Sequence, residues 1–122
     1  MFKILIIDDD EDLLFLGSSM LRQKGYDVFA LAKAENISQV VRSFRPELIL
    51  LDIKLGEADG RNICLALKND PETKQIKVIL YSAFPETSID VLKYGAVDFI
   101  LKPYDFKHLV NSIDRHLKLT IN

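Results

Sequence analysis

Short apolar runs alternate along the chain with segments in which apolar residues recur every three or four positions. Each apolar run is rich in leucine or β-branched residues and is bounded by polar or turn-forming residues, which predicts a strand. The predicted strands are 2–7, 26–31, 48–51, 78–81 and 98–101. Helical spacing follows each of them, over 13–21, 34–44, 60–67, 85–95 and 106–117. We therefore expect five strands that alternate with five helices.

The ends of these helices carry the residues that usually stop or start a helix. Gly25 and Gly95 follow the first and fourth helical segments, and Pro46 follows the second. Pro85 is well placed for the first turn of the fourth helix, and Asp105 for the cap of the fifth. The fourth segment is accordingly predicted to be a regular helix that runs from Pro85 to Gly95.

Alternating strands and helices with short connections predict an α/β fold. In such a fold a parallel sheet is covered on both faces by helices, and the crossovers are right-handed. For five (βα) units the doubly wound, flavodoxin-like strand order 2-1-3-4-5 is the natural candidate. We expect one domain that spans residues 1–122, with a switch point between strands one and three.

Composition narrows the functional classes. The 122 residues are 48% hydrophobic and 28% charged, with a net charge of −2, which is typical of a soluble globular domain. Such a balance gives no basic surface for direct nucleic-acid binding, and no run reaches the ~20 apolar residues of a membrane helix. The single cysteine, Cys64, cannot form an internal disulfide and falls in a helical pattern, as a core residue. A cytoplasmic location without membrane contact is expected.

Carboxylates stand at the ends of the two strands that flank the switch point. Asp8 and Asp9 follow strand one, and Asp52 directly follows strand three. Two like charges ~4 Å apart repel by about 4 kcal/mol at an effective dielectric constant near 20, so such a cluster favours a bound cation. Carboxylate oxygens suit Mg²⁺. Alternatively, Asp52 simply starts a turn, and the acids at 8–10 interact favourably with the positive end of the first helix. This alternative does not explain why Asp52 faces those acids.

A hydroxyl and an ammonium group lie at the ends of the last two strands. Ser82 directly follows strand four and Lys102 directly follows strand five, at the same sheet edge as the carboxylates. Together they supply the hydrogen bonds and charge that a bound phosphoryl group needs. Taken singly, Ser82 is more often a capping residue and Lys102 a solvated charge.

Five short motifs, in this order and on these elements, resemble the receiver domains of two-component response regulators, a CheY-like family. They are Ile-Ile-Asp-Asp at 6–9, Leu-Leu-Asp at 50–52, Asp-Gly at 59–60, Tyr-Ser-Ala at 81–83 and Leu-Lys-Pro at 101–103. The resemblance covers almost the whole chain. It implies a signalling module in a phosphorelay, which is not an enzyme and catalyses only its own phosphorylation and dephosphorylation.

The resemblance also implies roles for the acidic residues. Asp52 corresponds to the phospho-acceptor, which takes a phosphoryl group from the phosphohistidine of a histidine kinase. Asp9 corresponds to a direct Mg²⁺ ligand, and Asp8 to its partner, which acts largely through water. Asp52 itself and the backbone carbonyl of Lys54 complete the implied protein ligands.

Three further residues take their expected roles from the same resemblance. Ser82 would bind a phosphoryl oxygen and relay the signal. Lys102 would pair with the acyl phosphate, and its peptide bond to Pro103 is expected to be cis. Phe99 stands where the family has an aromatic switch residue, although it can also be read as a plain core phenylalanine.

Three positions near Asp52 bear on how long a phosphoryl group would last. Gly56 replaces the proline usual in the loop after the acceptor, which suggests a more mobile loop. Lys54 and Phe84 flank the site with a long cation and a bulky ring. We hypothesise that these two side chains tune the access of hydrolytic water.

Partners follow from the resemblance as well. A sensor histidine kinase or phosphotransfer protein would act upstream, and a downstream protein or output domain would read the surface of helix four, strand five and helix five. Phosphorylation-dependent homodimers are a further expectation. Whether the protein is a stand-alone receiver or part of a longer chain is open from the sequence.

Two other functional classes remain open. One is a Mg²⁺-dependent phosphohydrolase with an aspartyl nucleophile, for which Asp8 is followed by Asp10 at the expected spacing, although the chain is short for a cap insertion. The other is a binding module that keeps only the fold. The combination of Asp52, Ser82 and Lys102 argues against the second class.

Overall fold

The computed structural model describes residues 1–88 and 90–121. A five-stranded sheet consists of β1 (Lys3–Ile7), β2 (Asp27–Leu31), β3 (Leu48–Asp52), β6 (Lys77–Ser82) and β7 (Asp98–Leu101). The α-helices are α1 (Glu11–Gln23), α2 (Ile37–Phe44), α3 (Gly60–Asn69) and α4 (Phe106–Ile121). A small ribbon of β4 (Lys54–Leu55) and β5 (Ala58–Asp59) and two 3₁₀ turns, η1 (Pro85–Ser88) and η2 (Val91–Tyr94), complete the chain.

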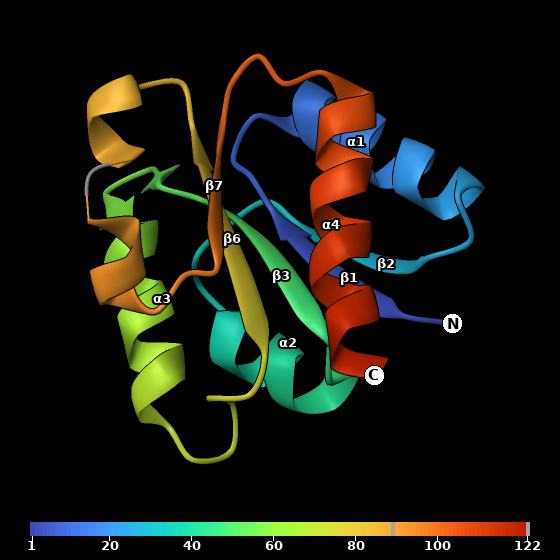
Figure 1. Cartoon of the computed structure of the whole chain (residues 1–122). Coiled ribbons are helices and arrows are strands. Elements are labelled where there is room, and N and C mark those ends of the chain that lie inside the picture. The colour runs from blue at the N-terminus through green and yellow to red at the C-terminus, as the bar shows by residue number, and fades with distance from the viewer. Residues whose placement is uncertain (89, 122) are drawn as a thin grey trace.

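The sheet is parallel throughout, in the order β2-β1-β3-β6-β7. Counted along the chain, this is the predicted order 2-1-3-4-5, and the α/β, flavodoxin-like fold class is confirmed. Helices lie on both sides of the sheet, as Figure 1 shows. The five predicted strands are all present, with ends that differ by at most two residues.

Alternate side chains of the central strands point to opposite faces and build two cores. Leu5 and Ile7 of β1 pack in one core with residues of α2 and α3, including Cys64. Ile4 and Ile6 pack in the other core with residues of α1 and α4. Because β3 is buried along its whole length on both faces, it is apolar at every position before Asp52.

Capping residues fix where the first helix begins and ends. The Asp10 carboxylate accepts a hydrogen bond from the backbone N–H of Leu13 at 3.2 Å, which satisfies a free donor of the first turn of α1. Gly25, at φ 97°, takes the left-handed conformation just after the helix. The acidic run after β1 is thus divided between the cap of α1 and the sheet edge.

The predicted regular helix from Pro85 to Gly95 is wrong. The segment forms two short 3₁₀ turns, and Asp90 between them has a left-handed φ of 63°. The hydroxyls of Thr87 and Ser88 donate to the carbonyls of Phe84 and Pro85, local bonds that compete with helix formation. Ile89, an apolar residue of the predicted helix, lies outside the described residues.

Among the described residues, no helix combines the length and the apolar character needed to cross a membrane. The longest, α4, covers Phe106–Ile121 and alternates apolar residues with charged ones. Its apolar side packs on the sheet through Leu109 and Ile113.

Candidate functional site

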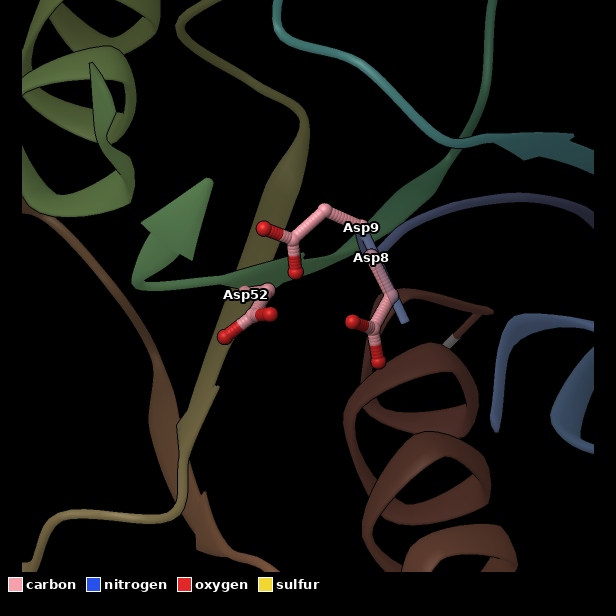
Figure 2. Close-up of side chains that lie close together, drawn as sticks. All are labelled: Asp8, Asp9 and Asp52. Carbon is pink, nitrogen blue, oxygen red and sulfur yellow. The ribbon is translucent and has the colours of Figure 1, made fainter. Parts of the chain in front are cut away.

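Two neighbouring strands bring three carboxylates together at the carboxyl edge of the sheet. Ile7 of β1 is in register with Leu51 of β3, so the residues that follow them, Asp8 and Asp52, lie beside each other. Asp8, Asp9 and Asp52 each offer an oxygen, and these oxygens lie within 4.8 Å of one another (Figure 2). Such a group of hard oxygen donors can hold a metal ion, and its chemistry fits Mg²⁺.

The three acids differ in exposure and in hydrogen bonding. Asp8 is fully buried and Asp52 is 4% exposed, whereas Asp9 is exposed. Oδ1 of Asp8 accepts from the backbone N–H of Asp10 at 2.9 Å. Oδ2 of Asp9 accepts from the backbone N–H of Gly56 at 3.0 Å, which ties the turn of the β4–β5 ribbon to the acid cluster.

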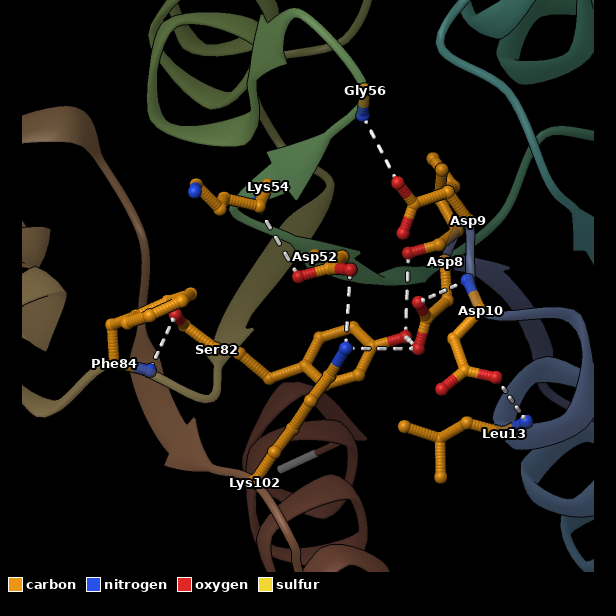
Figure 3. A network of polar contacts seen from close by, with 12 residues as sticks. Asp8, Asp9, Asp10, Leu13, Asp52, Lys54, Gly56, Ser82, Phe84 and Lys102 are labelled. Atoms are coloured by element: carbon orange, nitrogen blue, oxygen red, sulfur yellow. Dashed lines mark hydrogen bonds and ion pairs between the residues drawn. The ribbon is translucent and has the colours of Figure 1, made fainter.

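Lys102 supplies the positive charge of the site. It follows β7, and its Nζ lies 3.1 Å from Oδ2 of Asp8 and 3.1 Å from Oδ2 of Asp52. The Lys102 side chain is only 14% exposed, so one poorly solvated ammonium is shared by two buried carboxylates (Figure 3). The Lys102–Pro103 peptide bond is cis, as expected.

The charge state of Asp52 reflects this crowding. Burial is the largest cause, and together with the contact to Asp8 it raises the pKa of Asp52 from 3.8 to about 7, against the opposing effect of Lys102. Near neutral pH, therefore, only part of the Asp52 side chains are ionised. A divalent cation would compete with the proton on the rest.

The chain after Asp52 is folded around its carboxylate. The backbone N–H of Lys54 lies 3.3 Å from Oδ1 of Asp52. Lys54 and Asp59 pair across the β4–β5 ribbon, an element that the sequence did not predict, and the Asp59 side chain then caps α3. The implied role of the Lys54 carbonyl as a metal ligand stays a prediction.

Ser82 ends β6 beside the acid cluster. It is 1% exposed, and its Oγ accepts from the backbone N–H of Phe84 at 3.0 Å. Its carbonyl accepts from the backbone N–H of Lys102 at 2.8 Å, which joins the ends of β6 and β7. Because Oγ is an acceptor in this arrangement, the hydroxyl proton remains able to reach another oxygen.

Lys54 and Phe84 form a pair at the mouth of the site. Nζ of Lys54 lies 4.9 Å from the centroid of the Phe84 ring, a cation–π contact. Phe84 is 42% exposed, so the ring faces solvent rather than the core. The two residues singled out for tuning are therefore in direct contact.

Phe99 lies on β7, half-buried, against the core that α2 and α3 cover. Its neighbour in register is Leu80 of β6, two residues before Ser82. This location fits a core phenylalanine, and its role as a switch stays a prediction.

Tyr81 also belongs to the site, although its role was not predicted from the sequence. Tyr81 is fully buried, and its hydroxyl donates to Oδ2 of Asp8 at 2.7 Å and contacts the carbonyl of Ile7 at 3.3 Å. Burial, reinforced by the charge of Asp8, raises the pKa of Tyr81 well above 10, so the phenol stays a donor. The signal was a tyrosine in the otherwise aliphatic run before Ser82.

Residues 4–114 match the model of the protein family described as "Response regulator receiver domain". The sensory transduction protein BceR of Halalkalibacterium halodurans is 32% identical over 124 residues, which cover all of this chain and 52% of that protein. The DNA-binding response regulator MtrA of Mycobacterium tuberculosis is 32% identical, over 95% of this chain and 50% of that protein. The chain thus spans about half the length of these relatives.

Solved structures agree with the match. The BeF3-activated receiver domain of RstA from Klebsiella pneumoniae superposes with a TM-score of 0.86 at 28% identity, covering 94% of this chain and 97% of that one. A CheY-like response regulator receiver domain from Methanospirillum hungatei superposes with a TM-score of 0.88 at 28% identity, covering 97% of this chain and 94% of that one.

Proposed function

The chain belongs to the response regulator receiver domain family, and we propose that Asp52 is its phospho-acceptor. The observation that carries the proposal is the position of Lys102, which is 3.1 Å from Asp52 inside a cluster of three acids. Receiver domains are signalling modules. Accordingly, the chemistry proposed for this chain is limited to its own phosphorylation and dephosphorylation.

In the proposed step, one carboxylate oxygen of ionised Asp52 forms a bond to phosphorus as the bond from phosphorus to the donor's leaving atom breaks. The leaving atom is a histidine nitrogen when a kinase or phosphotransfer protein is the donor, and it keeps the electron pair of the broken bond. Lys102 then pairs with the new phosphoryl oxygens. The Ser82 hydroxyl donates a hydrogen bond to another of them.

Mg²⁺ is the metal that we propose for the acid cluster, with Asp8, Asp9, Asp52 and the backbone carbonyl of Lys54 as its ligands. When bound, it would neutralise negative charge on the phosphoryl oxygens. The three carboxylates have only one ammonium, Lys102, among the described contacts to balance them. A divalent cation would correct that imbalance.

The downstream consequence that we propose is a change at the surface of η1, η2, β7 and α4. Ser82 is in register with Leu101 of β7, so a movement of Ser82 toward a phosphoryl group acts on that strand. Phe99, two residues earlier on β7, is the proposed second switch residue. A phosphoryl group would bias two arrangements of this surface rather than create a new one.

A sensor histidine kinase or phosphotransfer protein is the proposed donor, and a downstream protein or output domain is the proposed reader. The name of MtrA as a DNA-binding response regulator makes an output domain in a longer chain one form this reader could take. A phosphorylation-dependent homodimer, a cytoplasmic location and a single domain over 1–122 stay predictions.

Intact-mass measurement after incubation with acetyl phosphate and Mg²⁺ tests the proposal. Wild type is expected to gain one phosphoryl group, and Asp52→Asn is expected to gain none. Asp12→Asn is the matched control, because Asp12 is an exposed acid in the first turn of α1. An adduct that persists in Asp52→Asn, or no adduct on wild type, would overturn the assignment.

A further inference from the structure

Tyr81 lies directly beneath the charged groups of the site. It is in register with Asp52 of β3, and its hydroxyl donates to Oδ2 of Asp8 at 2.7 Å. Nζ of Lys102 lies 4.5 Å from the centroid of its ring. One side chain therefore contacts both the buried carboxylate of Asp8 and the ammonium that Asp8 shares with Asp52.

The hydrogen bonds of Asp8 show what the hydroxyl does. Oδ1 accepts a hydrogen bond from the backbone N–H of Asp10. Oδ2 accepts one from the Tyr81 hydroxyl and forms an ion pair with Lys102. Asp8 is fully buried, so each of these partners replaces a lost contact with water. Removing one partner of a buried charged group is costly, because the remaining charge is left without compensation.

Lys102 has three N–H donors, which it now directs at Asp8 and Asp52, and a phosphoryl group on Asp52 would compete with Asp8 for them. Under the proposed function, Lys102 turns toward the phosphoryl group on Asp52 and its contact with Asp8 weakens. The Tyr81 hydroxyl then becomes the side-chain partner that remains at Oδ2. It is anchored by a fully buried ring inside the sheet core, so it does not follow Lys102.

We propose that Tyr81 is a positioning residue, whose hydroxyl holds the Asp8 carboxylate in place for a divalent cation while Lys102 is free to move. This inference rests on the proposed function and adds a residue to it. Outer partners that orient metal-binding carboxylates commonly change metal affinity by about 10- to 100-fold when they are removed.

Tyr81→Phe isolates the hydroxyl, because the ring and its contact with Lys102 are kept. Tyr104→Phe is the matched control. The Tyr104 ring lies 6.1 Å from the Tyr81 ring, and its buried hydroxyl has no hydrogen-bond partner among the described residues. The same chemical change is thus made at two adjacent tyrosines, only one of which bonds to Asp8.

Isothermal titration calorimetry with MgCl2 measures the effect. We expect Tyr81→Phe to weaken Mg²⁺ binding about tenfold or more. We expect Tyr104→Phe to stay within about twofold of wild type. Thermal unfolding in EDTA is recorded in parallel, since a purely structural role would lower the metal-free unfolding temperature and leave the Mg²⁺ affinity unchanged.

A pair of variants without the Asp8 charge gives an independent test. If Tyr81 acts through Asp8, adding Tyr81→Phe to Asp8→Asn changes Mg²⁺ affinity by less than about twofold. The double variant also removes the buried charge that a missing hydroxyl would leave uncompensated, so it is the variant to use if Tyr81→Phe alone does not fold.

The outcomes separate the two proposals. If wild type binds Mg²⁺ and is phosphorylated while Tyr81→Phe binds Mg²⁺ equally well, the role of Tyr81 is overturned and the proposed function stands. A clear further loss of affinity in the double variant would also overturn it. If wild type neither binds Mg²⁺ nor gains a phosphoryl group, the proposed function fails first.

Discussion

Individual side chains at this sheet edge are arranged around one shared ammonium. Lys102 lies 3.1 Å from both Asp8 and Asp52, and both carboxylates are almost fully buried. In a site of low dielectric constant such electrostatic contacts are strong, so a change in the charge or position of one partner alters the interaction energy of the others. The chemistry therefore depends on a few atoms whose positions are set by strand ends, rather than on a deep cavity.

The contact between Lys54 and Phe84 gives a prediction at this scale. The Lys54 ammonium and the Phe84 ring contact each other, and the backbone N–H groups of the two residues bond to Asp52 and Ser82. If this contact limits the access of water, removing either side chain should shorten the lifetime of phosphorylated Asp52. A cation–π contact at an exposed position corresponds to a change of about two- to fivefold. We expect this increase in autodephosphorylation rate for Lys54→Ala and for Phe84→Ala, measured by loss of the phosphoryl adduct over time.

The double variant Lys54→Ala/Phe84→Ala should hydrolyse no faster than the faster single variant, because the two residues act as a pair. Lys24→Ala, which removes an exposed lysine at the end of α1, serves as the control. Unchanged adduct lifetimes in both single variants would exclude the tuning role.

Whole elements position the site through close backbone contacts. The backbone N–H of Gly60, the first residue of α3, donates to the carbonyl of Ile53 at 2.7 Å. A Cβ atom at Gly60 would lie 2.3 Å from the backbone oxygen of Asp52, a distance that no relaxed structure allows. The start of α3 is thus pressed against the residue that carries the acceptor carboxylate.

Gly60→Ala should therefore affect stability and chemistry together. We expect a loss of about 1–3 kcal/mol in the free energy of unfolding, from overpacking, and slower phosphorylation by acetyl phosphate because Asp52 is displaced. Denaturant unfolding and the rate of adduct formation are the two measurements.

Gly25→Ala is the control for Gly60→Ala, because it introduces backbone strain without displacing Asp52. Gly25 has a positive φ, but a Cβ there would meet nothing within 4 Å. The variant should lose about 1 kcal/mol from backbone strain and keep the wild-type phosphorylation rate. Wild-type stability and rate in Gly60→Ala would contradict the packing argument.

At the scale of the whole molecule, the site lowers stability at neutral pH when no metal is present. The pKa of Asp52 is raised in the folded state from 3.8 to about 7. Between these values the folded protein holds a proton that the unfolded chain has released. Stability contributed by Asp52 is therefore present at acidic pH and is lost as the pH rises through about 7.

Comparing wild type with Asp52→Asn in EDTA isolates this effect. We expect the variant to unfold at a temperature at least about 4 °C higher than wild type at pH 8, the shift that roughly 1 kcal/mol produces in a small domain. The difference should shrink toward pH 4. Differential scanning calorimetry across this range provides the measurement, and a difference that does not vary with pH would refute the linkage.

At pH 8, added Mg²⁺ should reduce the difference in unfolding temperature between Asp52→Asn and wild type. A ligand that binds the folded state alone stabilises it in proportion to the logarithm of its concentration above its dissociation constant. Wild type should gain thermal stability with added Mg²⁺, and Asp52→Asn should gain less. Equal gains in the two proteins would mean that Asp52 does not contribute to the metal site.

The sequence by itself determined the strand order and the edge at which the chemistry lies. Short apolar runs such as Leu48–Leu51 favour strands buried on both faces, and their alternation with amphipathic helices leaves few topologies. Asp8, Asp52, Ser82 and Lys102 were identified because each directly follows or ends a predicted strand. A local pattern is sufficient when one periodicity dominates a segment.

Only the tertiary structure decided two kinds of feature: those set by competing local hydrogen bonds, and those set by partners far apart in the chain. The segment from Pro85 to Gly95 has helical spacing, but local hydroxyl bonds and a left-handed Asp90 divide it into two turns. Tyr81 was not predicted as a site residue, because the partner of its hydroxyl, Asp8, is 73 positions away in the chain. Burial fixed where that hydroxyl points, and no local pattern contains that information.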